Sequence, residues 1–185
     1  MAAGSRAWSA LLALPLLAGC WTGTSFYAPQ EVRAPIAPGI YRTVGTGSPS
    51  NQGRYRLSIR GDGYTSVAQV DGSETTVAGF APLPGRDGPF VAWFQESVEK
   101  GWEPGTMPYG LLERRGREYV LSFPMCSETR ALAEAAGAVF LPDPKVPLCR
   151  FSDRASLEAG LRRAAEEGPM ESLRLVPAGK GDGDD

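Results

Sequence analysis

Alternation of apolar and polar residues is the clearest pattern in this chain, and it predicts β-strands. In residues 54–60, tyrosine, leucine and isoleucine alternate with arginine and serine, so one face of this strand would be buried and the other wet. Gly61-Asp62-Gly63 is a turn sequence, and residues 64–70 resume an extended pattern. Together these segments predict a β-hairpin.

Further strands are predicted on both sides of this hairpin. Residues 90–94 are apolar at every position, which is typical of a strand covered on both faces, so we expect this segment at the centre of the core. The other predicted strands are short apolar segments bounded by turn residues, at 39–44, 75–80, 109–114, 118–123 and 171–176.

Two helices are predicted late in the chain. Ser127 can cap a short helix that runs through Ala136 and ends at Gly137, with Leu132 and Ala135 facing inward. Ser152 or Asp153 can cap a longer helix that ends at Gly168-Pro169. Its apolar face would hold Leu157, Leu161, Ala164 and Ala165, and its polar face Arg154, Glu158, Arg162 and Glu166.

These elements predict one α+β domain over residues 38–177. An antiparallel β-sheet meander of six to eight strands would carry the two C-terminal helices packed on one face. The sheet could curl into a half-barrel, and a closed lipocalin-like barrel is the alternative. Residues 178–185 are rich in glycine and aspartate, which predicts a disordered acidic tail.

The first 20 residues carry an export pattern. Arg6 precedes an apolar run from Ala7 to Leu17 that is too short to span a bilayer. Leu17-Ala18-Gly19-Cys20 resembles the lipobox of bacterial lipoproteins. This resemblance, which covers residues 1–20 only, implies that residues 1–19 are a signal peptide and that Cys20 becomes the first mature residue, acylated with chains such as palmitate. An ordinary signal peptide cleaved after Cys20 is the alternative.

The resemblance also implies a place in the cell. The partner would be a membrane, to which the lipid anchor attaches the protein. In such lipoproteins, an aspartate directly after the cysteine is associated with retention in the inner membrane, and this chain has Trp21 there instead. The outer membrane, facing the periplasm, is therefore favoured. Residues 20–37 contain two prolines and no sustained period, so we expect a flexible tether.

Cysteine parity predicts a disulfide. If Cys20 carries lipid, Cys126 and Cys149 remain as a pair, and an exported pair usually oxidises. Closing a loop of about twenty residues stabilises a domain by on the order of 3 kcal/mol. A catalytic thiol is disfavoured because the chain has neither a Cys-x-x-Cys spacing nor a histidine.

Composition excludes several functions. The net charge is −2 and the basic residues are scattered, which gives no electrostatic footprint for nucleic acid. The absence of histidine removes Ser-His-Asp and Cys-His catalysis and His-ligated metal. No phosphate loop, dinucleotide fingerprint or calcium loop is present, so we expect no cofactor and no metal.

Two groups of residues are candidates for function. Glu96, Glu99 and Glu103, near Trp93 and Trp102, are the candidate general acids, although no motif fixes their geometry and solvated acids are the favoured interpretation. A candidate binding surface consists of Trp102, Tyr109, Arg114, Arg115 and Arg117, whose arginines could receive a phosphate or a carboxylate.

The sequence therefore predicts an envelope lipoprotein with a non-enzymatic binding or structural role. Its partner would be an envelope protein or a cell-wall component. A carboxylate-dependent hydrolase of envelope glycans is the alternative.

Overall fold

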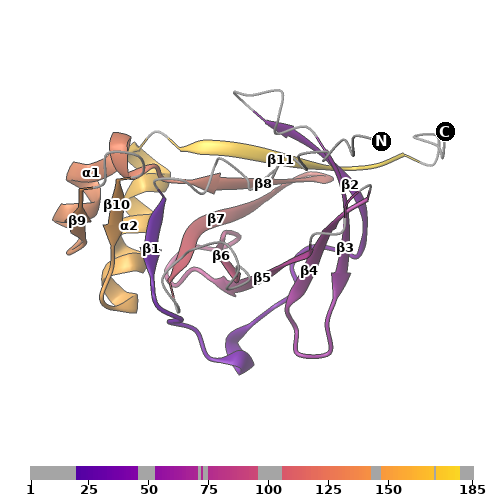
Figure 1. The fold of residues 1–185 in the computed structure, drawn as a ribbon, viewed down its shortest axis with the longest axis horizontal. Coiled ribbons are helices and arrows are strands. Elements are labelled where there is room, and N and C mark those ends of the chain that lie inside the picture. The colour runs from indigo at the N-terminus through magenta and orange to yellow at the C-terminus, as the bar shows by residue number, and fades with distance from the viewer. Residues whose placement is uncertain are drawn as a thin grey trace, which may run out of the picture.

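Eight antiparallel strands form a closed barrel in the computed structural model, which describes residues 20–45, 53–70, 72, 75–95, 106–142, 147–168 and 170–179 (Figure 1). In order around the wall, the strands are β2 (Gly39–Gly45), β3 (Arg54–Ile59), β4 (Thr65–Gln69), β5 (Thr75–Pro82), β6 (Phe90–Gln95), β7 (Met107–Arg115), β8 (Glu118–Phe123) and β11 (Glu171–Pro177). The predicted signal peptide, residues 1–19, lies outside the described residues.

The barrel closes through its last strand. Leu175 of β11 pairs with Thr43 of β2 on one edge and with Tyr119 of β8 on the other. Between them, β2 to β8 pair each with the next, including β6 with β7. The antiparallel meander is confirmed, but the half-barrel is wrong: β11 pairs with both neighbours and leaves no open edge between them.

The strand β6 is covered on both faces, as predicted for residues 90–94. Ala92 and Phe94 belong to the apolar cluster inside the barrel, whereas Val91 and Trp93 belong to a second cluster outside the wall. This alternation follows from the pleat, which sends successive side chains to opposite faces. Residues from β5 and β7 divide in the same way, so the molecule has two cores separated by the barrel wall.

The outer core is covered by a small extension of the sheet and by two helices. Three short strands, β1 (Trp21–Gly23), β10 (Leu148–Arg150) and β9 (Val139–Leu141), continue from β7 in that order. The helices α1 (Cys126–Ala135) and α2 (Arg154–Glu167) lie together on this side of the barrel (Figure 1). The expectation that both late helices pack on one face is confirmed.

The disulfide between Cys126 and Cys149 is present. Their Cα atoms are 5.4 Å apart, within the range that a disulfide requires. Cys126 is the first residue of α1 and Cys149 lies in β10. The bridge therefore fixes the start of α1 against the small sheet that precedes α2.

The helix predictions hold in outline, but the cap predicted at Ser127 is wrong, because α1 begins at Cys126 and its N-cap is Met125. Two side chains also face differently from the prediction. Asp153 caps α2, because its Oδ1 accepts a hydrogen bond from the Ser156 N–H at 2.9 Å. Glu158, predicted on the polar face, is only 7% exposed. In α1, Ala135 is exposed, and Thr129 and Ala133 are the inward residues. Both errors arise because the partner surfaces, and not helical periodicity alone, decide which face is covered.

Residues 20–37 pack on the domain, so the predicted flexible tether is wrong. Cys20 and Trp21 are fully buried, and the Trp21 indole N–H donates to Thr129 Oγ1 at 2.9 Å. Residues 29–31 form a short 3-10 helix, η2 (Pro29–Glu31). The prolines do not make this segment flexible, because its dispersed aromatic and branched side chains are buried against the barrel.

Candidate functional site

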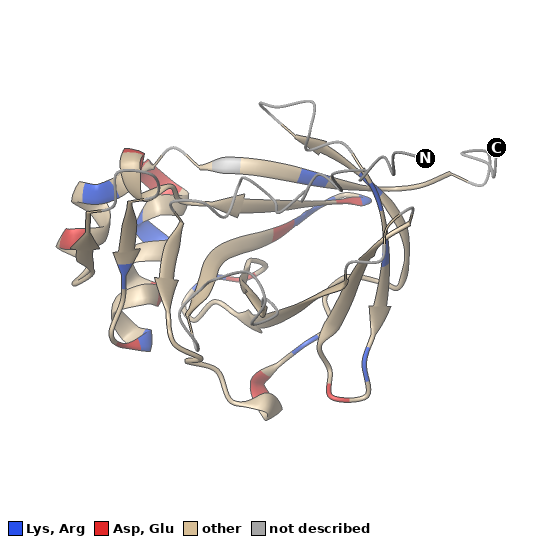
Figure 2. Ribbon diagram, viewed as in Figure 1, with Lys and Arg blue, Asp and Glu red and all other residues tan. Residues whose placement is uncertain are grey.

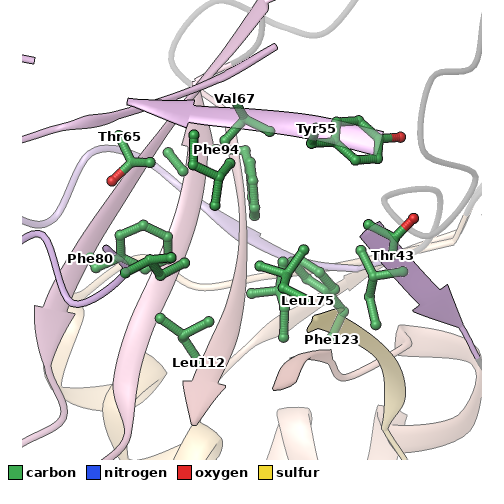
Figure 3. A pocket seen from close by; sticks show the side chains of 14 residues that line it. Thr43, Tyr55, Thr65, Val67, Phe80, Phe94, Leu112, Phe123 and Leu175 are labelled. Atoms are coloured by element: carbon green, nitrogen blue, oxygen red, sulfur yellow. The ribbon is translucent and has the colours of Figure 1, made fainter. Parts of the chain in front are cut away.

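An apolar cavity of about 50 Å³ lies inside the barrel (Figure 3). Eleven apolar side chains line it: Ile36, Leu57, Val67, Ala78, Phe80, Phe94, Leu112, Leu121, Phe123, Leu173 and Leu175. The three remaining lining residues, Thr43, Tyr55 and Thr65, each carry one hydroxyl group. Except for Ile36, all of these residues lie at inward positions of the barrel strands.

The cavity exists because small residues occupy neighbouring inward positions. Ala78 of β5 pairs with Thr65 of β4 and with Phe94 of β6. The interior of an eight-stranded barrel is just wide enough to be filled by side chains or to hold one small ligand. An alanine and a threonine side by side leave part of that width unfilled.

The lining hydroxyl groups do not make the cavity polar. Thr43 Oγ1 is engaged with the backbone of Gly53, from whose N–H it accepts a hydrogen bond at 2.8 Å. Thr65 Oγ1 is buried without a hydrogen-bond partner. None of the described residues that line the cavity is Asp, Glu, Lys or Arg, so these residues can hold an apolar group and supply no charged acid or base to act on it.

A segment that we call the strap, residues 24–38, crosses from β1 to β2 along the barrel. Its backbone is held at Arg33, whose N–H donates to the Phe80 carbonyl at 2.8 Å. Ile36 of the strap joins the cavity lining. The strap therefore completes the apolar surface that the strands leave open.

The strap is fastened to α2 by a charged network. Tyr27 stacks on Trp93 at 4.7 Å between ring centroids, and its hydroxyl donates to Glu158 at 3.0 Å. Arg154 lies over the Tyr27 ring, 4.4 Å from its centroid. The same guanidinium donates to Glu158 at 2.7 Å and to Glu31 at 2.6 Å.

This network explains how α2 tolerates a buried carboxylate. Arg154 neutralises Glu158 and the Tyr27 hydroxyl supplies a further hydrogen bond, so the burial cost is offset. Burial, followed by the charge on Glu158, raises the pKa of Tyr27 well above its usual range. The Ala28 N–H, followed by Arg154, lowers the pKa of Glu31. The network thus brings two carboxylates together, those of Glu31 and Glu158, and both hold the strap against α2.

Tyr109 is not a surface residue, contrary to the sequence-based expectation. It is fully buried, and its hydroxyl donates to the Thr24 carbonyl and accepts a hydrogen bond from the Phe26 N–H at 3.3 Å. Burial raises the pKa of Tyr109 to about 12. Tyr109 therefore attaches the start of the strap to β7.

The predicted arginine cluster lies apart from Tyr109, at the turn between β7 and β8. Arg114, Arg115 and Arg117 are exposed there. Arg115 pairs with Glu113 at 3.0 Å, and Arg114 donates to the Gly116 carbonyl at 3.1 Å. Trp102 and the candidate acids Glu96, Glu99 and Glu103 lie outside the described residues.

Sequence reasoning missed the cavity and the strap. The signal for the strap was present in its apolar residues, such as Tyr27, Val32 and Ile36, which a solvated linker would not need. Among the described residues, no group of His, Cys, Asp and Glu side chains could hold a metal ion. None of the helices formed by those residues is both long and apolar enough to cross a membrane.

Comparison of this chain with protein-family models, with curated proteins and with solved structures gives no match.

Glu31→Gln should make the stability of the protein less dependent on pH. The folded-state pKa of Glu31 is below its ordinary value of 4.5. The ionised carboxylate therefore contributes fully to the free energy of unfolding above pH 4.5, and this contribution is lost as the pH falls through the folded-state pKa. In urea unfolding at neutral pH, the wild-type protein should therefore have a larger free energy of unfolding than Glu31→Gln. This difference should shrink as the pH is lowered.

The control is Glu166→Gln, whose mostly exposed carboxylate lies 3.8 Å from Arg86. It should differ little from wild type at any pH. A Glu31→Gln difference that stays constant down to pH 3 would contradict the role given to the network.

Proposed function

We propose that the protein is a lipid-anchored component of the bacterial envelope, with a non-enzymatic role in which the barrel binds a small apolar molecule or the end of a hydrocarbon chain. The observation that carries the binding role is the apolar cavity. The lipobox-like residues Leu17-Ala18-Gly19-Cys20 support the anchor. Trp21, in place of aspartate, favours the periplasmic face of the outer membrane by the same resemblance.

The size of the cavity limits what it can bind. An apolar cavity of about 150 Å³ holds a benzene molecule, and this one has about 50 Å³. Burial gains roughly 0.8 kcal/mol per methylene, so two or three methylenes would gain about 2 kcal/mol. The cavity therefore suits the tip of a longer hydrocarbon, whose remaining part would bind elsewhere.

Because residues 20–37 pack on the domain, a lipid anchor at Cys20 would have no flexible tether behind it. Cys20 Sγ lies 4.0 Å from Met125 Sδ, so acylation requires the thiol to turn away from this contact. Trp21 stays fixed in the outer core. A lipid on Cys20 would consequently hold the domain against the membrane with no spacer between them.

The binding role is favoured over hydrolysis of envelope glycans. A glycosidase needs two carboxyl groups facing one substrate. Glu31 and Glu158 converge on Arg154 and Tyr27, where they serve as structural partners. An envelope protein or a cell-wall component remains the larger partner that we propose for the outer surface.

Cys20→Ala should release the protein from the membrane fraction, because it removes the only thiol in the lipobox-like sequence. Intact mass should show acyl groups on the wild-type mature chain and none on the variant. Ser25→Ala, in the strap, is the control and should stay with the membrane. Unchanged membrane association of Cys20→Ala would refute the anchor.

Xenon should enter the barrel and shift the methyl resonances of Leu112, Leu121 and Leu173 in NMR spectra, because it is apolar and small enough for the cavity. Ala78→Val should abolish these shifts by filling the space. Ala68→Val is the matched control, since Ala68 lies at an outward position of β4. Absence of shifts in wild type, or their persistence in Ala78→Val, would argue against a binding cavity.

A further inference from the structure

Three arginines lie together on the outer wall of β2 and β3. Inward residues alternate with outward ones, and Tyr41 and Leu57 are inside the barrel. Arg42 of β2 and Arg54 and Arg56 of β3 therefore point outward. Figure 2 shows this side of the barrel, where β2, β3 and β4 contain no Asp or Glu.

Arg42 and Arg54 are direct cross-strand neighbours. The Thr43 N–H donates to the Gly53 carbonyl at 2.8 Å, so the residues at the next position, Arg42 and Arg54, form a non-hydrogen-bonded pair. In such a pair the Cα atoms are about 4.5 Å apart and the side chains are at their closest. Arg56 is the diagonal neighbour of Arg42, at about 7–8 Å.

These arginines lack the acidic partners that two neighbouring arginines have. Arg174 of β11 pairs with Glu118, and Arg60 pairs with Asp62 at 3.1 Å. None of the three forms an ion pair with any residue that the structure describes. In addition, Arg54 Nε is buried and has no hydrogen-bond partner.

Like charges placed directly opposite each other destabilise a sheet, and an unsatisfied donor adds to that cost. Both costs disappear if an anion lies between the two guanidinium groups. We propose that Arg42, Arg54 and Arg56 form a binding site for a phosphate group on the outer wall of the barrel. This site is independent of the cavity and of the anchor.

Phosphate fits the site better than carboxylate does. Its oxygens can accept hydrogen bonds from several guanidinium forks at once, and its charge of about −1.5 to −2 matches a cluster of three cations. Inorganic phosphate presents this group, and the headgroup of an anionic phospholipid presents a phosphodiester, which carries a single negative charge and has two free oxygens to accept the same hydrogen bonds. The experiment therefore uses both as probes.

The test follows the Arg54 Nε–H resonance by NMR in the full chain carrying Cys20→Ala, which keeps the anchor out of the measurement. Sodium phosphate should shift this resonance, whereas sodium chloride at equal ionic strength should not. Arg42→Gln should weaken phosphate binding about tenfold, as expected for loss of one charge-assisted hydrogen bond. Arg174→Gln, which removes an arginine already paired with Glu118, should change binding less than about twofold.

A second measurement, binding to lipid vesicles, distinguishes the two sources of phosphate. Binding to phosphatidylglycerol vesicles that is lost in Arg42→Gln identifies a lipid headgroup as a ligand, and phosphate binding without vesicle binding identifies a free or polymer-borne phosphate. Equal shifts with chloride and phosphate would overturn the proposal, as would vesicle and phosphate binding unaffected by Arg42→Gln. The variant should fold, because Arg42 is exposed and its removal relieves repulsion.

Discussion

The pairing of β11 with both β2 and β8 is the interaction on which the rest of this structure depends. Leu175 joins Thr43 on one side and Tyr119 on the other, which turns a meander into a closed wall. Closure divides the apolar residues into an inner and an outer core. The inner core holds the cavity, and the outer core gives α1, α2 and the strap a surface to cover.

The sequence predicted the local elements well because their signals are local. Alternation and turn residues identified the eight segments that became barrel strands, and Asp153 and Gly137 marked helix ends. Closure was not predictable, since the pairing of β11 with β2 joins residues far apart in the chain. The burial of Glu158 and Tyr109 was missed for the same reason: their partners, Tyr27 and Thr24, lie in a segment whose prolines and lack of periodicity resemble those of a linker.

The functional proposals use different parts of this architecture. The cavity depends on small inward residues such as Ala78, and the strap contributes Ile36 to its lining. The arginines Arg42 and Arg54 are on the opposite side of the same wall, where the pleat separates them from the apolar interior. Cys20 lies where the strand β1 begins, so an anchor there would place the whole barrel at the membrane. Glu31 and Glu158, two carboxylates that converge among the described residues, are both held by Arg154 as structural partners.

Amide hydrogen exchange across the β2–β11 seam tests barrel closure most directly. In a closed barrel, the backbone amides of β2 and β11 that point into the seam exchange only through large-scale unfolding, as slowly as those between β5 and β6. In a half-barrel, both strands would be edges whose outward amides exchange rapidly with solvent. Slow exchange on both strands is the result that we predict. Rapid exchange along Leu173–Pro177 and Tyr41–Gly45 would contradict the closed barrel, and with it the cavity that the barrel strands line.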